Sequence, residues 1–451
     1  MMKARTARSA AIIAVVAAVG LVSALVLMLA NPSQPSNTSS ERSASSTPPP
    51  PAVTSAPRPT TLDLPRIPWE GGPEYWKQFS AAAAAGWDNP DFFPIVVWYN
   101  GVSNDAEAQY DKDLGINTYI GMWEGTDYKL FEDNEIFWIG TKLNKTFTET
   151  STNWVGNFLD DEVDGRFTPE DGRAHLQERS EEVAGNGRFN YANFTQTVIS
   201  TDGTTADHQA YVNDYTDAVS VDMYWYTIPF CDWSTYRGEA YLNPINKDKC
   251  RTASSYGQTM DMLRQRDASD GVLQPLWQFV ENLNGGPGEG PFVASITSGQ
   301  LEGAVMNSII NEARGIVYFN QSFTGPCQGG SLFRQSQMEE DFCGAPQVAA
   351  ARAVNHRIHS LARVLNTQSY AHSFGAGLDT MLKADNGSAY IFAMVDGTSS
   401  PGERTFTLPA GLVGTSVEVI GEDRTLPVAA DGTFSDTFEH EYSYHIYRLA
   451  I

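Results

Sequence analysis

The stretch WVGNFLDDEVD, residues 154–164, decides how the rest of the chain is interpreted. Its apolar residues lead into three consecutive carboxylates, Asp160, Asp161 and Glu162. A short apolar run that ends in acids and precedes a helical segment is typical of one strand–helix unit of an α/β protein. Crowded carboxylates are unfavourable unless they bind, titrate or react. The end of this predicted strand is therefore either a functional site or a solvated acidic loop.

The composition describes a large acidic protein. The chain has 451 residues, with 54 acidic and 30 basic side chains and a formal net charge of -24. This length allows a large core and more than one domain. The negative field repels phosphate backbones, so we predict no nucleic-acid partner. Aromatic residues make up 11% of the chain; most must pack in the core, and the others would suit a polar ligand with apolar faces, such as a sugar.

The N-terminal segment has a composition of its own. Residues 10–30 form an uncharged apolar run after three basic residues, long enough to span a bilayer. The basic flank should stay in the cytoplasm and place the rest of the chain outside. We predict a membrane anchor at residues 1–30, with a cleaved signal peptide as the alternative. Residues 31–66, rich in Pro, Ser and Thr, predict an unfolded linker, so the protein is expected to be exported and either anchored at the cell surface or secreted.

Strand-like apolar runs alternate with helical or polar segments from residue 67 to about residue 323. Eight strands are expected, at residues 94–100, 116–123, 135–141, 154–164, 191–197, 219–226, 273–281 and 315–319. Helices are expected at residues 105–114, 169–183, 256–266, 298–313 and 346–366. Eight such repeats in roughly 250 residues are what a (β/α)₈ barrel needs, and we assign residues 67–370 to it. A doubly wound open sheet is the alternative, but no glycine-rich nucleotide loop follows the first strand.

Residues 371–451 predict a small antiparallel β-sandwich. Five short alternating segments are separated by Gly, Asp and Pro turns, at residues 389–395, 404–409, 416–421, 433–438 and 444–449. This spacing is typical of sandwich strands. The segment contains no cluster of catalytic side chains, so we expect a structural cap on the barrel, with a carbohydrate-binding module as the alternative.

The four cysteines fall into two close pairs without the CxxC spacing of a zinc site. In an exported protein the expected disulfides are Cys231–Cys250 and Cys327–Cys343, in the loops after the sixth and eighth strands; reduced buried thiols are the alternative. The histidines are scattered and no serine nucleophile elbow is present. We predict no metal and no cofactor.

Two carboxylates stand out because they close predicted strands. Glu162 ends the fourth strand and Glu281 ends the seventh, and a barrel brings all carboxyl ends of its strands to one face. Retaining hydrolysis of a glycosidic bond needs two carboxyl groups about 5–5.5 Å apart. One has a raised pKa and protonates the leaving oxygen, and the other is ionised and attacks the anomeric carbon.

From about residue 94 onward the chain resembles the large group of retaining glycoside hydrolases on (β/α)₈ barrels, in an uncharacterised extracellular bacterial branch. The resemblance is carried by LGINTYIGMWEG, the DDE ending, EARGIVYFNQSF, RTLPVAADGTFSDTF and the terminal YHIYRL. It implies Glu162 as acid/base and Glu281 as nucleophile. Two positions depart from the group: Asp161 stands where an Asn commonly holds the substrate 2-hydroxyl, and the eighth strand ends in Phe319-Asn320 where a Trp is frequent.

Further candidate residues lie at the expected strand ends. A phenol of the sixth strand would orient Glu281, with Trp225 pointing the other way. Asp222 is expected to be a hydrogen-bonded acid of the barrel interior, and Asp160 is the alternative acid. The residues that we predict to contact substrate are Asp161, Trp98, Trp123, Glu124, Tyr224, Tyr226, Trp277 and Asn320.

The sequence thus predicts an exported glycoside hydrolase that cleaves O-glycosidic bonds of a polysaccharide or oligosaccharide by retaining double displacement. A carbohydrate-binding barrel without catalysis and a structural protein of the cell wall are the alternatives.

Overall fold

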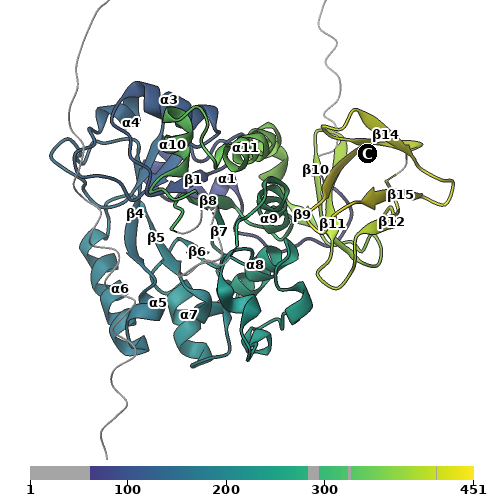
Figure 1. The fold of residues 1–451 in the computed structure, drawn as a ribbon, viewed down its shortest axis with the longest axis horizontal. Helices are drawn as coiled ribbons and strands as arrows, with labels where there is room; N and C mark the ends of the chain where they lie inside the picture. The colour runs from purple at the N-terminus through teal and green to yellow at the C-terminus, as the bar shows by residue number, and fades with distance from the viewer. Residues whose placement is uncertain (1–60, 283–293, 324–326, 413) are drawn as a thin grey trace, which may run out of the picture. The chain divides into compact units, whose positions relative to one another are not determined.

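The computed structural model describes residues 61–282, 294–323, 327–412 and 414–451 (Figure 1). The predicted anchor and residues 31–60 of the predicted linker lie outside the described residues. Within the described ranges, no helix combines the length and the apolar character needed to span a bilayer.

Eight parallel strands close into a barrel, which confirms the predicted fold and excludes the open doubly wound sheet. In order around the barrel the strands are β1 (Ile95–Trp98), β2 (Thr118–Ile120), β3 (Phe137–Ile139), β4 (Trp154–Asp161), β5 (Phe189–Phe194), β6 (Ala218–Val221), β7 (Leu276–Glu281) and β8 (Gly315–Phe319). The helices that follow these strands lie around them in Figure 1: α3 (Asp105–Asp113), α4 (Lys129–Asp133), α5 (Val163–Arg166), α6 (Pro169–Val183), α7 (Thr205–Asn213), α8 (Ser254–Asp267), α9 (Ser298–Ile310), α10 (Leu332–Met338) and α11 (Ala345–Leu365).

Aromatic side chains fill the amino-terminal end of the barrel, where the strands begin. Trp277, near the start of β7, packs against Tyr191 of β5 with ring centroids 5.1 Å apart. Trp87, which follows the short helices α1 (Pro73–Trp76) and α2 (Ser80–Ala84), closes this end against Phe189 at 5.2 Å. A larger residue than glycine does not fit at position 315, because a Cβ there would lie 2.7 Å from the Trp277 side chain. The N-terminal end of the barrel is therefore solid core.

The C-terminal segment forms two antiparallel sheets. One has the strand order β14-β13-β16-β11-β10-β9, and the other pairs β12 with β15. The strands are β9 (Ser369–Tyr370), β10 (Leu378–Asp385), β11 (Ser388–Val395), β12 (Gly402–Thr407), β13 (Ser416–Val419), β14 (Arg424–Pro427), β15 (Thr433–Phe438) and β16 (Tyr444–Ala450). Phe406 and Phe434 stack at 4.6 Å in the core between the sheets. The predicted sandwich is confirmed, and all five expected segments are strands.

Both predicted disulfides are confirmed. Cys231 bonds Cys250 in the loop between β6 and α8, and Cys327 bonds Cys343 in the connection between β8 and α11. Each closes a short loop at the carboxyl end of its strand, where cross-links restrict the backbone that surrounds a barrel site.

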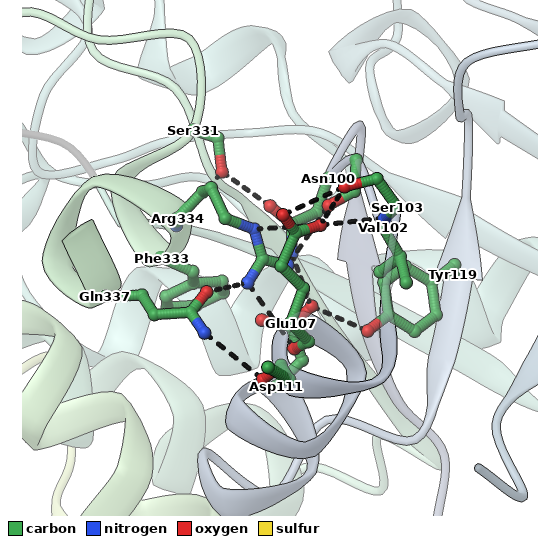
Figure 2. Close-up of polar contacts among 12 residues, drawn as sticks. Asn100, Val102, Ser103, Glu107, Asp111, Tyr119, Ser331, Phe333, Arg334 and Gln337 are labelled. Carbon is green, nitrogen blue, oxygen red and sulfur yellow. Dashed lines mark hydrogen bonds and ion pairs between the residues drawn. The ribbon is translucent and has the colours of Figure 1, made fainter. Parts of the chain in front are cut away.

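A buried ion pair fixes the rim of the barrel beside β1 and β8. Figure 2 shows Arg334 of α10 pointing toward Asp111 of α3, at 2.7 Å. Asp111 also accepts hydrogen bonds from Tyr119 at 2.6 Å and from the Asn100 amide at 2.8 Å. Burial raises the pKa of Asp111 to about 6, although Arg334 opposes this shift. These contacts lock α3, α10 and the end of β1 together.

Candidate active site

Carboxyl groups from three strands gather at the carboxyl end of the barrel. Asp161 ends β4 and Glu162 follows it, Asp222 comes directly after β6, and Glu281 ends β7. Because the strands of a closed parallel barrel all point the same way, these four acids share one face. This is the face at which (β/α)₈ enzymes build their sites.

Glu162 has a strained backbone. Its φ of 50° and ψ of 34° lie in the left-handed region, which costs a residue with a Cβ about 1 kcal/mol or more. A hydrogen bond of 2.9 Å from its N–H to the Asn193 carbonyl of β5 holds it there. Such strain persists where the surrounding structure enforces it, and it is concentrated at functional sites.

Asp222 and Glu162 form a carboxyl–carboxyl pair. Burial raises the pKa of Asp222 well above its ordinary range, and the charge of Glu162 and a hydrogen bond between the two side chains raise it further. Two carboxyl groups in contact cannot both ionise at neutral pH without strong repulsion. The raised pKa of Asp222 therefore favours its protonated form, which donates to Glu162.

A chain of hydrogen bonds inside the barrel positions Asp161. The Asn193 amide donates to Asp161 at 2.9 Å, Ser220 donates to Asn193 at 2.7 Å, and the Tyr191 and Ser220 hydroxyls are 2.6 Å apart. Burial raises the pKa of Asp161 to about 7, while the bond from Asn193 opposes the shift. Asp160 turns the other way and bonds Arg166 and the α6 residue His175, each at 2.6 Å. It is therefore outside the acid cluster.

Glu281 is fully buried and held by hydroxyl groups. The Tyr256 hydroxyl lies 2.7 Å from both of its carboxyl oxygens, and Thr227 donates at 3.2 Å. Burial raises the pKa of Glu281 to about 7, because it outweighs these hydrogen bonds to the charged form. The phenol that orients Glu281 thus comes from the first turn of α8, which the sequence did not indicate.

One phenol lies within electrostatic reach of the whole acid cluster. Tyr224 is buried inside the barrel mouth. Burial raises its pKa most, and the charges of Asp222, Asp161, Glu162 and Glu281 raise it further, in that order. The charges of all four carboxyl groups therefore act on Tyr224.

Tyr226 has a different role from Tyr224. Its hydroxyl donates to Glu441 at 2.8 Å, its ring lies 5.5 Å from that of Tyr256, and its N–H donates to the Tyr256 hydroxyl at 3.1 Å. It therefore supports the phenol that holds Glu281. Trp225 points outward, as predicted, and donates to Thr259 of α8 at 3.0 Å.

The predicted stacking tryptophans separate into three environments. Trp98 is 6% exposed, and its ring packs on Phe158 with centroids 5.3 Å apart. Trp123 is 66% exposed in the loop after β2, and the next residue, Glu124, is also exposed. Trp277 is fully buried near the amino end of β7, so we correct its assignment: it packs the barrel core and presents no face to a sugar. An aromatic residue that the sequence did not indicate, Tyr99, is 49% exposed at the end of β1.

Asn320 follows β8 but is fully buried. Its amide nitrogen donates to Ser331 at 3.0 Å and to Asn100 at 3.3 Å, and its oxygen accepts from the Phe333 N–H at 3.0 Å. These partners use both ends of the amide, so in this structure Asn320 organises the loop before α10. Among the described residues, no group of three or more His, Cys, Asp or Glu side chains is arranged to hold a metal ion.

Comparisons with known proteins return fold likenesses only. No protein-family model and no curated protein matches the chain. Among solved structures, Amy13B of Eubacterium rectale is similar with a TM-score of 0.45 and 9% identity, covering 80% of this chain and 96% of that one. The GH30 endoxylanase of Clostridium papyrosolvens C71 has a TM-score of 0.43 and 9% identity, covering 87% and 99%. The family 51 α-L-arabinofuranosidase AbfB of Bifidobacterium longum has a TM-score of 0.43 and 12% identity, covering 80% and 96%. With TM-scores below 0.5, these likenesses assign neither a family nor an activity.

Proposed function

We propose that the protein is a glycoside hydrolase that cleaves O-glycosidic bonds of a polysaccharide or oligosaccharide with retention of configuration. The observation that carries this proposal is that carboxyl groups end or directly follow β4, β6 and β7 at the carboxyl end of a closed parallel barrel. Pairs of carboxyl groups in different environments are the machinery that glycosidic cleavage requires.

Glu162 is the proposed acid/base. The pKa of Asp222 is raised, which favours a proton on its carboxyl beside Glu162, and this proton can pass through Glu162 to the glycosidic oxygen as the bond breaks. After the first step Glu162 accepts a proton from the water that attacks the glycosyl–enzyme bond. Asp222 thus keeps Glu162 supplied with a proton in the resting enzyme.

Glu281 is the proposed nucleophile. Tyr256 and Thr227 donate hydrogen bonds to its oxygens, and such donors favour the carboxylate over the neutral acid. The carboxylate attacks the anomeric carbon, and the resulting ester is hydrolysed in the second step. With its pKa raised to about 7, Glu281 is ionised mainly above neutral pH.

Two exposed aromatic rings flank the ends of β1 and β2, where we propose that sugar rings stack. Trp123 lies against Gly101, and Tyr99 lies against Gly121. Both rings contact a glycine and leave a large fraction of their surface exposed to solvent. Aromatic faces of this kind suit the apolar faces of pyranose rings.

Glu162→Gln and Glu281→Gln should each lower hydrolysis of an activated aryl glycoside by about 10² to 10⁴-fold, measured over a panel of such substrates. Azide should give a glycosyl azide of inverted configuration with Glu281→Gly and of retained configuration with Glu162→Ala, because azide replaces a different group in each case. Asp160→Asn, which alters an acid of the same strand that points toward α6, is the matched control and should keep its activity. Full activity of either Gln variant would overturn the proposal, and binding without turnover over the panel would indicate a carbohydrate-binding barrel.

We further propose that the enzyme acts outside the cytoplasm and is anchored through residues 10–30. Two disulfides are formed, and structural disulfides persist in oxidising compartments. The apolar run after three basic residues has the length and flank of an anchor that leaves the barrel outside. N-terminal sequencing of the exported protein tests this, because a cleaved chain would lack the run.

A further inference from the structure

A carboxylate of the sandwich contacts the barrel beside the acid cluster. Glu441 lies between β15 and β16, and its two oxygens accept different donors. One accepts from the Tyr226 hydroxyl at 2.8 Å, and the other accepts from the Ala253 N–H, also at 2.8 Å. Ala253 is the N-cap residue of α8, and a negative charge at a helix N-terminus is favourable because the free N–H groups point toward it.

The two segments that Glu441 contacts are connected to Glu281 through Tyr256. Tyr256, in the first turn of α8, accepts from the Tyr226 N–H at 3.1 Å and places its hydroxyl 2.7 Å from both oxygens of Glu281. Glu441 therefore holds the two segments that fix the Tyr256 phenol, one through Tyr226 and one through the start of α8.

Docking of the sandwich rests on other contacts as well. Asp379 of β10 accepts from Asn307 at 3.1 Å and from Asn311 at 2.8 Å, and both donors belong to α9 or its end. Tyr444 of β16 donates to Glu302 of α9 at 3.1 Å. These contacts attach the sandwich to α9, whereas Glu441 reaches the loop after β6. The Glu441 contact thus does more than join the two sheets to the barrel.

We propose that Glu441 is a positioning residue for Glu281, so that the sandwich completes the active site of the barrel. This inference rests on the proposed role of Glu281 as nucleophile. Truncating Glu441 frees the Tyr226 hydroxyl and the start of α8, which lets the Tyr256 phenol move away from Glu281. Small displacements of a catalytic group cost about 10²-fold in rate.

The test uses the full chain with Glu441→Ala, Glu441→Gln and Tyr226→Phe, and Tyr444→Phe as the matched control. Glu441→Ala should lower kcat by about 10- to 100-fold and change KM by less than about threefold. Tyr226→Phe should give a similar loss, and the double variant should lose less than the sum, because both changes break one path. Tyr444→Phe removes a bond to α9 and should leave kcat unchanged. An equal loss in Tyr444→Phe would show that only docking matters, and would overturn the proposal.

A titration of the Glu281 carboxyl by ¹³C NMR separates this proposal from the proposed function. The signal is assigned by its absence in Glu281→Gln and needs no substrate. Looser donation from Tyr256 should raise the pKa of Glu281 in Glu441→Ala and in Glu441→Gln, but not in Tyr444→Phe. This shift supports the positioning role even if no glycoside is hydrolysed. An unchanged Glu281 titration in folded Glu441→Gln and Tyr226→Phe would refute it.

Discussion

Replacing Glu281 with Gln should stabilise the protein above neutral pH while abolishing its proposed activity. Burial raises the pKa of Glu281 from its ordinary 4.5 to about 7, so ionisation is less favourable in the folded chain than in the unfolded chain. Each pKa unit corresponds to about 1.4 kcal/mol, which gives a cost of about 3 kcal/mol once the group is ionised. Glutamine has no charge to bury and avoids this cost.

The direction of the stability difference follows from the number of protons bound to the folded and unfolded chains. Below pH 4.5 the carboxyl is neutral in both states, and the two proteins should differ little. Between pH 4.5 and pH 7 the unfolded chain releases this proton while the folded chain keeps it. The wild-type chain therefore loses stability that the Gln variant keeps, and the difference should reach about 3 kcal/mol near pH 7 and change little at higher pH. Urea titrations at pH 4, 6 and 8, extrapolated to water, measure it.

Glu312→Gln is the matched control because its effect should have the opposite sign. Burial disfavours the charged form of Glu312 too, but Arg314 and Lys383 outweigh burial and lower its pKa to about 2. That carboxylate stabilises the fold above pH 4.5, so Glu312→Gln should destabilise the protein at pH 8. A Glu281→Gln variant whose stability relative to wild type does not change between pH 4 and pH 8 would refute the reasoning.

Three further variants test other parts of the structure. Tyr256→Phe removes a donor to both oxygens of Glu281, which should raise the pKa of that carboxyl. The acid limb of the profile of kcat/KM against pH should therefore move to higher pH by about one unit, and an unmoved limb would contradict this prediction. Asp222→Asn removes one carboxyl of the proton-sharing pair and should move the alkaline limb to lower pH, visible in the same profile. Arg334→Met leaves Asp111 buried without its cation and should lower the free energy of unfolding by about 3–5 kcal/mol in urea titrations; adding Asp111→Asn should recover part of the loss.

Much of the fold could be predicted because local signals and periodicity agree. Helix α6 spans Pro169–Val183 as predicted, since Thr168 caps it and a proline occupies its first position. The apolar run at residues 219–226 continues past the end of β6 at Val221. Sequence could not show this end, because a strand stops where its neighbours stop pairing, and β7 pairs with β6 only as far as Gln278.

The places of the candidate acids at strand ends could be predicted, but their hydrogen-bond partners could not. Tyr256 lies 25 residues before Glu281 on a helix whose pattern indicates only core packing, and tertiary structure alone brings its hydroxyl to that carboxyl. The Trp277 side chain points into the barrel, but the residue lies at the amino end of β7, which begins at Leu276. It is therefore too far from the carboxyl end of the strand to contact a substrate there. Asn320 is a polar residue after a strand, yet its amide nitrogen donates to Ser331 at the start of α10 and to Asn100, which is remote in sequence.

The left-handed backbone of Glu162 places selection for stability in conflict with selection for the proposed activity. Glycine adopts this conformation freely, so Glu162→Gly would relieve local strain while removing the proposed acid/base. If Glu162 has the proposed role, laboratory evolution that selects for thermal stability alone would therefore favour inactive variants at this position. A screen for hardier versions should keep turnover as a second criterion.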